Sequence, residues 1–418
     1  MRKALNTLLT EKLTRRTFLN SSGKAAAVGA VATSTTFPFT ASAETSAQAS
    51  KEEVKYSACL VNCGSRCPLK VHVKDGVISY IDSEDGINDE VFGEHQITPC
   101  LRVRANRYKT YNHDRIKSPL LRVGKRGEGK FKKISWDEAT TLIADKLKYT
   151  IEKHGNEAIF YQYGTGCNGG NIHGRNAMRR FLSSTGGYLN YHNSYSTAQI
   201  SRIEPFVYGK GHGSFMSEIA NSDLVVMFCQ NLAETRMSGG GQIYEVLQAL
   251  EKSQAKVIII DPRYTDSSIG LNAEWLPIRP GTDAALVAGI VHTLVDEGLA
   301  DDDFINKYAT GWDEDNLPAT APKNSSYKSY IMGKYNDGIE KTAEWAADLT
   351  RIPAARIRQL AREMASANNA WISQGWGLQR TANGEQGCRS IMMLPVITKQ
   401  FGKPGPNTGD WLYHEEPY

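Results

Sequence analysis

Four cysteines occur early in the chain, and their chemistry is that of metal ligands: Cys59, Cys63, Cys67 and Cys100. Four soft thiolates could hold a 4Fe–4S cluster or a single zinc ion, and the spacing leaves both alternatives open. A disulfide framework fits a chain of 418 residues with seven cysteines poorly. Pro68 after the third cysteine and Arg102 after the fourth favour a cluster. Arg102 is a cation, and a cation beside a cluster stabilises its reduced form. We expect Cys167, Cys229 and Cys388 to be small buried hydrophobic residues.

A second group of residues with chemical potential follows the expected strands. Segments rich in Gly, Asn and Arg come after four of them: Tyr163–Gly170, Cys229–Arg236, Asp261–Asp266 and Gln374–Gly384. In a parallel α/β sheet, ligands bind beyond the carboxyl ends of the strands. Such loops suit close backbone approach to phosphates and heterocycles. None of them matches a P-loop or the Gly-x-Gly-x-x-Gly fingerprint, which disfavours a simple NAD enzyme.

The hydrophobic pattern predicts the elements that would position these loops. Mostly apolar runs predict strands at 158–163, 224–228, 256–260 and 370–374. Apolar residues at helical spacing predict helices at 243–250, 284–294 and 356–365. The capping box Ser135-Trp136-Asp137-Glu138 predicts a further helix through about Lys153. This alternation indicates an α/β fold with parallel sheets flanked by helices.

The cysteines fall in a segment of a different kind. Leu69 to Ile81 alternates between apolar and polar residues around Asp75-Gly76, which is a hairpin signal. We therefore expect residues 54–118 to form a small β-rich module that holds the four cysteines.

Composition and charge exclude some classes of protein. Hydrophobic residues make up 40% of the chain and charged residues 22%, as in ordinary globular proteins. No apolar run approaches the ~20 residues that span a bilayer. The net charge of +4 originates in residues 1–43, which carry six basic side chains and one acidic one. The remainder is close to neutral, so we expect no nucleic-acid partner.

The N-terminal segment 1–43 is typical of an export signal. The paired arginines of Thr14–Leu19 precede the apolar run Ala25–Ala32, and Ala41-Ser42-Ala43 supplies a cleavage site. This order resembles a twin-arginine (Tat) signal peptide, with a disordered basic tail as the alternative. We expect residues 44–53 to be a flexible lead-in and the protein to be exported to the periplasm. Because the Tat route carries folded proteins, the signal also favours a cofactor inserted before export.

The cysteine segment Ser57–Pro68 resembles the cluster segment of molybdopterin oxidoreductases of the dimethyl sulfoxide reductase family, closest to the catalytic subunits of the anaerobic type. Further matching segments follow in order along the chain: 163–166, 195–200, 234–241, 260–266, 275–286 and 373–377. The resemblance covers only the N-terminal half of the family's length. It implies a 4Fe–4S module at 54–118, an incomplete α/β molybdopterin domain at 119–200 and 369–418, and a Rossmann-like α/β nucleotide-side domain at 201–368. The family's C-terminal half is expected to be absent.

The resemblance also implies two cofactors and their ligands. The four cysteines would bind the 4Fe–4S cluster. Ser196 would bind the molybdenum of a bis(molybdopterin guanine dinucleotide), where the alternative is a serine in a simple turn. Arg102 would lie between cluster and pterin, and Arg236 would line the substrate funnel. Further cofactor contacts are implied for Gly164, Thr165, Gly166, Asn231, Glu234, Asp261, Arg263, Asp283, Gln374, Gly375 and Trp376. Asp261 could instead only end a strand, and Trp376 could be a core residue.

Two departures from the family pattern bear on these contacts. Val103 stands where glycine is common, and Cys229-Gln230-Asn231 stands where a glycine and an asparagine are usual.

The implied activity is molybdenum-dependent reduction of S-oxides or N-oxides in anaerobic respiration, with electrons entering through the cluster. The implied partners are a ferredoxin-like iron–sulfur subunit, a quinol-oxidising membrane anchor subunit and a small S-oxide or N-oxide substrate. One alternative is an inactive truncated or split fragment that binds the cluster and needs a second chain for activity. Another is a cluster-only electron-transfer module, against which Ser196 and the nucleotide-side loops argue.

Overall fold

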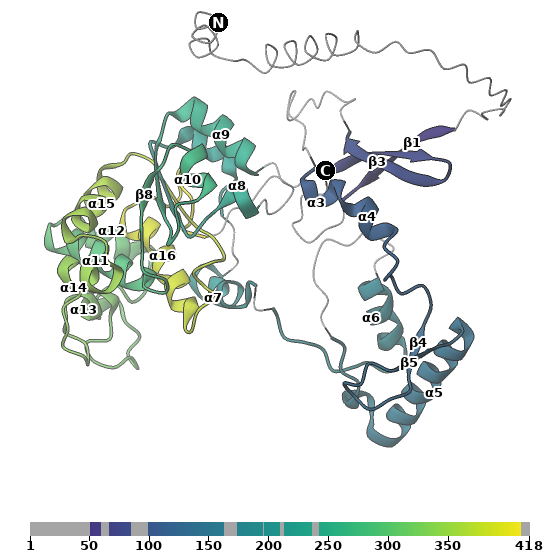
Figure 1. Cartoon of the computed structure of the whole chain (residues 1–418). Coiled ribbons are helices and arrows are strands. Elements are labelled where there is room, and N and C mark those ends of the chain that lie inside the picture. The colour runs from purple at the N-terminus through teal and green to yellow at the C-terminus, as the bar shows by residue number, and fades with distance from the viewer. Residues whose placement is uncertain are drawn as a thin grey trace, which may run out of the picture. The chain divides into compact units, whose positions relative to one another are not determined.

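In the computed structural model, the described residues are 51–59, 67–84, 99–162, 174–194, 196–209, 213–235 and 242–410 (Figure 1). The chain divides into two units, 1–51 and 52–418. The predicted signal peptide and residues 44–50 of the predicted lead-in lie outside the described residues, while Glu52 and Glu53 of that lead-in belong to a strand. None of the described helices is long and apolar enough to cross a membrane.

The predicted β-rich module contains an antiparallel sheet of three strands. These are β1 (Glu52–Ala58), β2 (Pro68–Lys74) and β3 (Val77–Ser83), in the order β1-β2-β3. The hairpin between β2 and β3 is confirmed, and its turn residues Asp75 and Gly76 both have positive φ, as a tight hairpin requires. Two short helices follow, α3 (Leu101–Arg104) and α4 (Asn106–Thr110), and both contact β3.

The next segment holds a short hairpin and two helices. Its elements are β4 (Leu120–Arg122), β5 (Phe131–Lys133), α5 (Trp136–His154), η1 (Asn156–Ala158) and α6 (Gly174–Ser184). The capping box prediction for α5 is confirmed, because the Ser135 hydroxyl accepts a hydrogen bond from the Glu138 amide at 3.0 Å.

The strand predicted at 158–163 is wrong over its described part. Ala158 ends a 3-10 turn, and Phe160 forms only an isolated parallel bridge to Leu189. A strand needs a continuous ladder with a neighbour, and the ladder here is a single bridge. Tyr163 lies outside the described residues.

The largest body of the structure is built on a four-stranded parallel sheet (Figure 1). The strands are β6 (Leu224–Phe228), β7 (Lys256–Ile260), β8 (Glu274–Leu276) and β9 (Ala370–Gln374), in the order β8-β7-β6-β9. Three of them have the predicted bounds, while the three-residue β8 was not predicted. The sheet, together with the β-rich module, confirms the expected α/β class.

Helices cover both faces of this sheet. One face packs against α7 (Ala198–Tyr208), α11 (Asp283–Asp296), α14 (Ala343–Thr350), α15 (Ala354–Ser366) and α16 (Gly384–Ile397). The other packs against η3 (Met216–Asn221) and α9 (Gln242–Ser253). Successive residues of β6 alternate between the two cores, with Val226 and Phe228 in the first and Val225 and Met227 in the second. The remaining elements are α8 (Leu232–Thr235), α10 (Asp266–Gly270), α12 (Asp302–Tyr308), η4 (Glu314–Asn316) and α13 (Tyr327–Ile331).

The position of β9 differs from the predicted grouping of 369–418 with 119–200. β9 pairs with β6 along its whole length, from Leu224 opposite Ala370 to Phe228 opposite Gln374. A strand buried on both faces, as β9 is, gains most as part of a sheet, and the side of β6 that does not pair with β7 supplies that place. The segment 370–410 therefore belongs to the same sheet body as 224–276. The other predicted domain boundaries stay predictions.

Candidate functional site

Three of the four predicted ligand-binding segments meet at the carboxyl edge of the parallel sheet. Cys229–Arg236 follows β6, Asp261–Asp266 follows β7 and Gln374–Gly384 begins at the last residue of β9. The chain leaves β6 toward β7 and β8 on one side and returns as β9 on the other. This reversal of direction creates a switch point between β6 and β9, where α/β sheets bind their ligands. The fourth segment, Tyr163–Gly170, lies outside the described residues, and so does Arg236.

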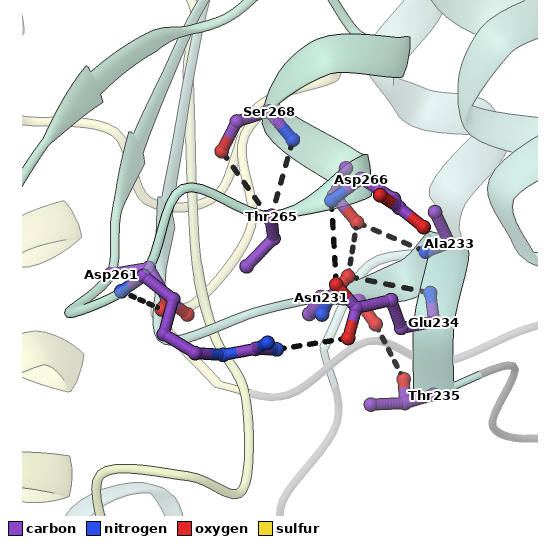
Figure 2. A network of polar contacts seen from close by, with 10 residues as sticks. Asn231, Ala233, Glu234, Thr235, Asp261, Thr265, Asp266 and Ser268 are labelled. Atoms are coloured by element: carbon purple, nitrogen blue, oxygen red, sulfur yellow. Dashed lines mark hydrogen bonds and ion pairs between the residues drawn. The ribbon is translucent and has the colours of Figure 1, made fainter.

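A polar network joins the loops after β6 and β7 (Figure 2). The Glu234 carboxylate forms an ion pair with Arg263 at 2.9 Å, and this contact lowers the pKa of Glu234. The side-chain oxygen of Asn231 accepts hydrogen bonds from the Ser267 hydroxyl at 2.8 Å and the Glu234 amide at 3.3 Å. The start of α10, which contains Asp266 and Ser267, is thus held against the start of α8. These contacts bring together the predicted residues Asn231, Glu234 and Arg263.

Two further predicted acids, Asp261 and Asp283, are buried at the same edge, with 9% and 3% of their surface exposed. The Asp261 carboxylate accepts a hydrogen bond from the Arg263 amide at 2.8 Å. Asp283 is the first residue of α11 and accepts one from the Cys229 thiol at 3.5 Å. Burial raises the pKa of both carboxyl groups. No described lysine or arginine forms an ion pair with either acid.

Cys229 differs from the expected buried hydrophobic residue. It is only partly buried, its φ is 47°, and its thiol contacts Asp283. Burial, reinforced by the charge of Asp283, raises the pKa of this thiol well above its ordinary value. A positive φ favours glycine, and Cys229-Gln230-Asn231 is the stretch where the family pattern includes a glycine. Cys388 is fully buried, as expected, and Cys167 lies outside the described residues.

The loop after β9 lies very close to the end of β6. The Gly375 amide donates to the Phe228 carbonyl at 2.8 Å, and a Cβ at Gly375 would lie 2.2 Å from the Cys229 carbonyl oxygen. Only glycine fits there, which explains the residue type at this predicted cofactor position. Gln374 is fully buried, and its side-chain amide nitrogen donates to the carbonyls of Cys388 and Gly409. Its side-chain oxygen has no hydrogen-bond partner within the described ranges.

Ser196, the predicted molybdenum ligand, lies two residues before the start of α7. Its carbonyl oxygen accepts hydrogen bonds from the Gln379 side-chain amide and from Arg380, the latter at 3.4 Å. No described residue hydrogen-bonds its hydroxyl. The Gln379 amide also donates to the Trp376 carbonyl at 3.4 Å. Ser196 is therefore tied to the loop that carries Trp376 by Gln379, a residue that the sequence analysis did not single out.

The cysteines of the β-rich module are only partly described. Cys59 and Cys67 are both buried, and the Cys59 amide donates to the Cys67 carbonyl at 2.9 Å where β1 ends and β2 begins. Val103 of α3 packs in the same small core, next to the helix start at Cys100. Arg102 is exposed on α3. Cys63 lies outside the described residues, and within them no three Cys, His, Asp or Glu side chains gather as a metal site. The four-cysteine set stays a prediction.

Comparisons with known proteins agree with this arrangement. Residues 115–416 match the molybdopterin oxidoreductase family, and residues 52–112 match the molybdopterin oxidoreductase Fe4S4 domain. The dimethyl sulfoxide reductase DmsA of Haemophilus influenzae is 50% identical over 408 residues, which are 95% of this chain and 50% of the relative. Trimethylamine-N-oxide reductase of the same organism is 32% identical over 387 residues, or 87% of this chain and 44% of that one. The chain spans about half the length of the curated relatives it matches.

Among solved structures, acetylene hydratase from Pelobacter acetylenicus superposes with a TM-score of 0.58 at 24% identity, over 84% of this chain and 44% of that one. That likeness concerns the fold alone. The family matches confirm the two predicted cofactors, a 4Fe–4S cluster and a molybdenum bis(molybdopterin guanine dinucleotide). On its two matched domains and its relatives, this chain belongs to the molybdopterin oxidoreductase family.

Proposed function

We propose that this chain is the catalytic subunit of a molybdenum oxotransferase that reduces S-oxides or N-oxides. The observation that carries the proposal is the identity of 50% to a dimethyl sulfoxide reductase over 95% of the chain. A relative named for trimethylamine N-oxide supports the wider substrate class.

The residues at the sheet edge fit a guanine dinucleotide. Asp261 and Asp283 are buried acceptors that form no ion pair with a described lysine or arginine. A buried carboxylate with few hydrogen-bond donors around it lowers the stability of the folded protein. A ligand rich in N–H donors would supply the missing hydrogen bonds to both carboxylates. The ring N–H and amino group of guanine are donors of this kind. The unpartnered side-chain oxygen of Gln374 is a further acceptor at the same edge.

When bound, the molybdenum centre supplies oxygen-atom abstraction from an S–O or N–O bond, and the cluster supplies electrons one at a time. In this proposal the Ser196 hydroxyl is the protein ligand of the metal. Asp261 and Asp283 would accept hydrogen bonds from guanine, and Arg263 would bind a phosphate or ribose. Arg102 would supply a positive charge between cluster and pterin, and Arg236 would orient the substrate. Cys59, Cys63, Cys67 and Cys100 would hold the cluster.

The whole protein's setting belongs to the same proposal. Electrons would come from a ferredoxin-like iron–sulfur subunit and a quinol-oxidising membrane anchor, in anaerobic respiration. The twin-arginine segment would direct the folded protein to the periplasm. A second candidate is a fragment that binds the cluster and needs another chain for activity.

Elemental analysis of the 418-residue chain, purified without oxygen, tests these proposals. We expect about one molybdenum and about four iron atoms per chain. Four irons without molybdenum would contradict the oxotransferase proposal and leave the fragment candidate. The absence of both molybdenum and iron would contradict both candidates. With both metals present, turnover of dimethyl sulfoxide and trimethylamine N-oxide by a reduced dye would test the substrate class.

A further inference from the structure

Gln379 uses its whole side-chain amide to join two segments of the candidate site. It is fully buried, and its oxygen accepts hydrogen bonds from the amides of Gln199 at 3.1 Å and Ile200 at 3.3 Å. Its nitrogen donates to the carbonyls of Ser196 and Trp376. An amide has two donor hydrogens and two acceptor lone pairs, so all four positions are occupied.

Gln199 makes the reciprocal set of contacts. Its side-chain nitrogen donates to the Thr381 carbonyl at 2.9 Å, and its side-chain oxygen accepts from the Glu385 amide at 2.8 Å. Glu385 lies in the first turn of α16, whereas Gln199 and Ile200 lie in the first turn of α7. Each glutamine therefore supplies an acceptor to the first turn of the helix on the other segment.

Neither helix start has a side-chain cap of its own. Thr197 before α7 and Asn383 before α16 make no capping hydrogen bond. The first amides of a helix need acceptors from outside the helix, and a buried helix start without them is destabilised. The two glutamines meet that need across the interface of α7 and α16. We refer to Gln199 and Gln379 together as the glutamine pair.

The pair has a consequence for Ser196. Because one NH2 group binds the carbonyls of both Ser196 and Trp376, the backbone at Ser196 cannot move without breaking a contact to the loop after β9. Arg380 adds a second donor to the Ser196 carbonyl. We propose that Gln379, supported by Gln199, is a positioning residue that holds Ser196 in register with the Gln374–Gly377 loop. This inference rests on the proposed function, in which Ser196 binds molybdenum and the loop contacts the pterin.

Gln400 offers a matched control on the same sheet. It is also buried, its side-chain oxygen accepts from the Ala370 amide at 3.0 Å, and its nitrogen donates to the Ala367 carbonyl at 3.0 Å. It stands at the amino end of β9, whereas the candidate site is at the carboxyl end. Replacing it removes the same kind of buried amide without touching Ser196.

The experiment compares three variants of the full chain with wild type, each purified without oxygen. Gln379→Leu removes all four hydrogen bonds. Gln379→Glu keeps an acceptor for the α7 amides but loses both donors and places an oxygen against the Ser196 and Trp376 carbonyls. Gln400→Leu is the control. Amide hydrogen exchange at Gln199 and Ile200 reports the helix contact, and the electron paramagnetic resonance spectrum of partly reduced molybdenum reports the geometry at the metal.

We expect Gln379→Leu to accelerate exchange at Gln199 and Ile200 by about fivefold or more, since each loses its hydrogen bond. Gln379→Glu should leave that exchange within about threefold of wild type. Both variants should shift the molybdenum spectrum, and Gln400→Leu should not. Should Gln379→Leu fail to fold, Gln379→Glu alone separates the contact with the α7 amides from the contact with the Ser196 and Trp376 carbonyls.

Three outcomes overturn the inference. An unchanged spectrum in loaded Gln379→Glu contradicts it while the proposed function stands. An equal spectral shift in Gln400→Leu contradicts it too, because the effect would then be general. A wild-type chain that binds iron but no molybdenum contradicts the proposed function and this inference together. Metal analysis identifies that case before any variant is made.

Discussion

The helices α5 and α11 are stabilised in opposite ways. α5 has 19 residues and buries only Ala139, with Trp136 71% exposed and Ile143 58% exposed. α11 has 14 residues and buries ten of them. Ser135 caps the start of α5, and the helix has acidic residues in its first turn and basic residues in its last turn. Thr282, which precedes α11, makes no capping hydrogen bond. Local signals form one helix, and burial against the sheet forms the other.

This difference matters for the candidate site because α11 carries one of its residues. Asp283 is the first residue of α11, so the packing of that helix against β6 and β7 places the carboxylate at the sheet edge. No predicted site residue lies on α5. The sheet body therefore provides the rigid support for the site, and changes there should cost more stability than comparable changes on α5.

The largest effect should come from the core side of α11. Ile290→Ala removes a fully buried side chain, and we expect a loss of about 3 kcal/mol in the free energy of unfolding. Ile143→Ala on α5 should cost less than about 0.5 kcal/mol. Urea unfolding followed by tryptophan fluorescence measures both. Equal losses would show that α5 is buried as well as α11, and the comparison would fail.

A second, smaller effect on stability should distinguish alanine substitutions at two glycines, Gly375 and Gly174. Gly375→Ala would place a methyl group 2.2 Å from the Cys229 carbonyl oxygen, and we expect it to cost about 2 kcal/mol. Gly174→Ala at the start of α6 meets no atom within 4 Å and should stabilise by about 0.5 kcal/mol. Thermal unfolding of the pair is the measurement. A neutral Gly375→Ala would mean that the loop after β9 can move away from β6.

The cap of α5 should have an effect of about 1 kcal/mol. Ser135→Ala removes the acceptor of the Glu138 amide, and faster hydrogen exchange at Glu138 should accompany the loss. Thr140→Ala, on the exposed face of the same helix, serves as the control and should change stability by less than about 0.5 kcal/mol. If the two variants behaved alike, local capping would not be what stabilises α5.

The smallest effect should be a pH-dependent one at Glu314. Hydrogen bonds from Ser326 and Ser329 lower the pKa of this carboxyl from 4.5 to about 2. A carboxyl whose pKa is lower in the folded state stabilises above its unfolded pKa, and this contribution is lost as the pH falls through the folded value. Glu314→Gln should thus be less stable than wild type at neutral pH, with the difference vanishing as the pH falls from 4.5 toward 2. Unfolding of both proteins across this range, with Glu152→Gln on α5 as the control, measures it. A difference that grew on acidification would have the wrong sign.

Much of the sheet body could be predicted from local sequence. β6, β7 and β9 have the predicted bounds because strands buried on both faces are rich in apolar residues, as in Leu224–Phe228. β8 was not predicted because only three of its residues pair with β7. Its Trp275 side chain also donates a hydrogen bond to the Asp261 carbonyl at the end of β7, which the sequence does not show. The strand predicted at 158–163 had the right composition but no neighbouring ladder. Pairing is a property of two segments, and one segment cannot show it.

The sequence by itself determined which residue types could bind cofactors, where the strands end, and therefore that the Asn231, Asp261 and Gln374 loops meet at one edge. The tertiary structure decided that β9 pairs with β6 and that Cys229 adopts a positive φ beside Asp283. It also decided the contact between Gln379 and Gln199, which are 180 residues apart. The start of a helix requires acceptors, but it does not specify which residue supplies them. Where a local cap is absent, only the packing of one helix against another makes that choice.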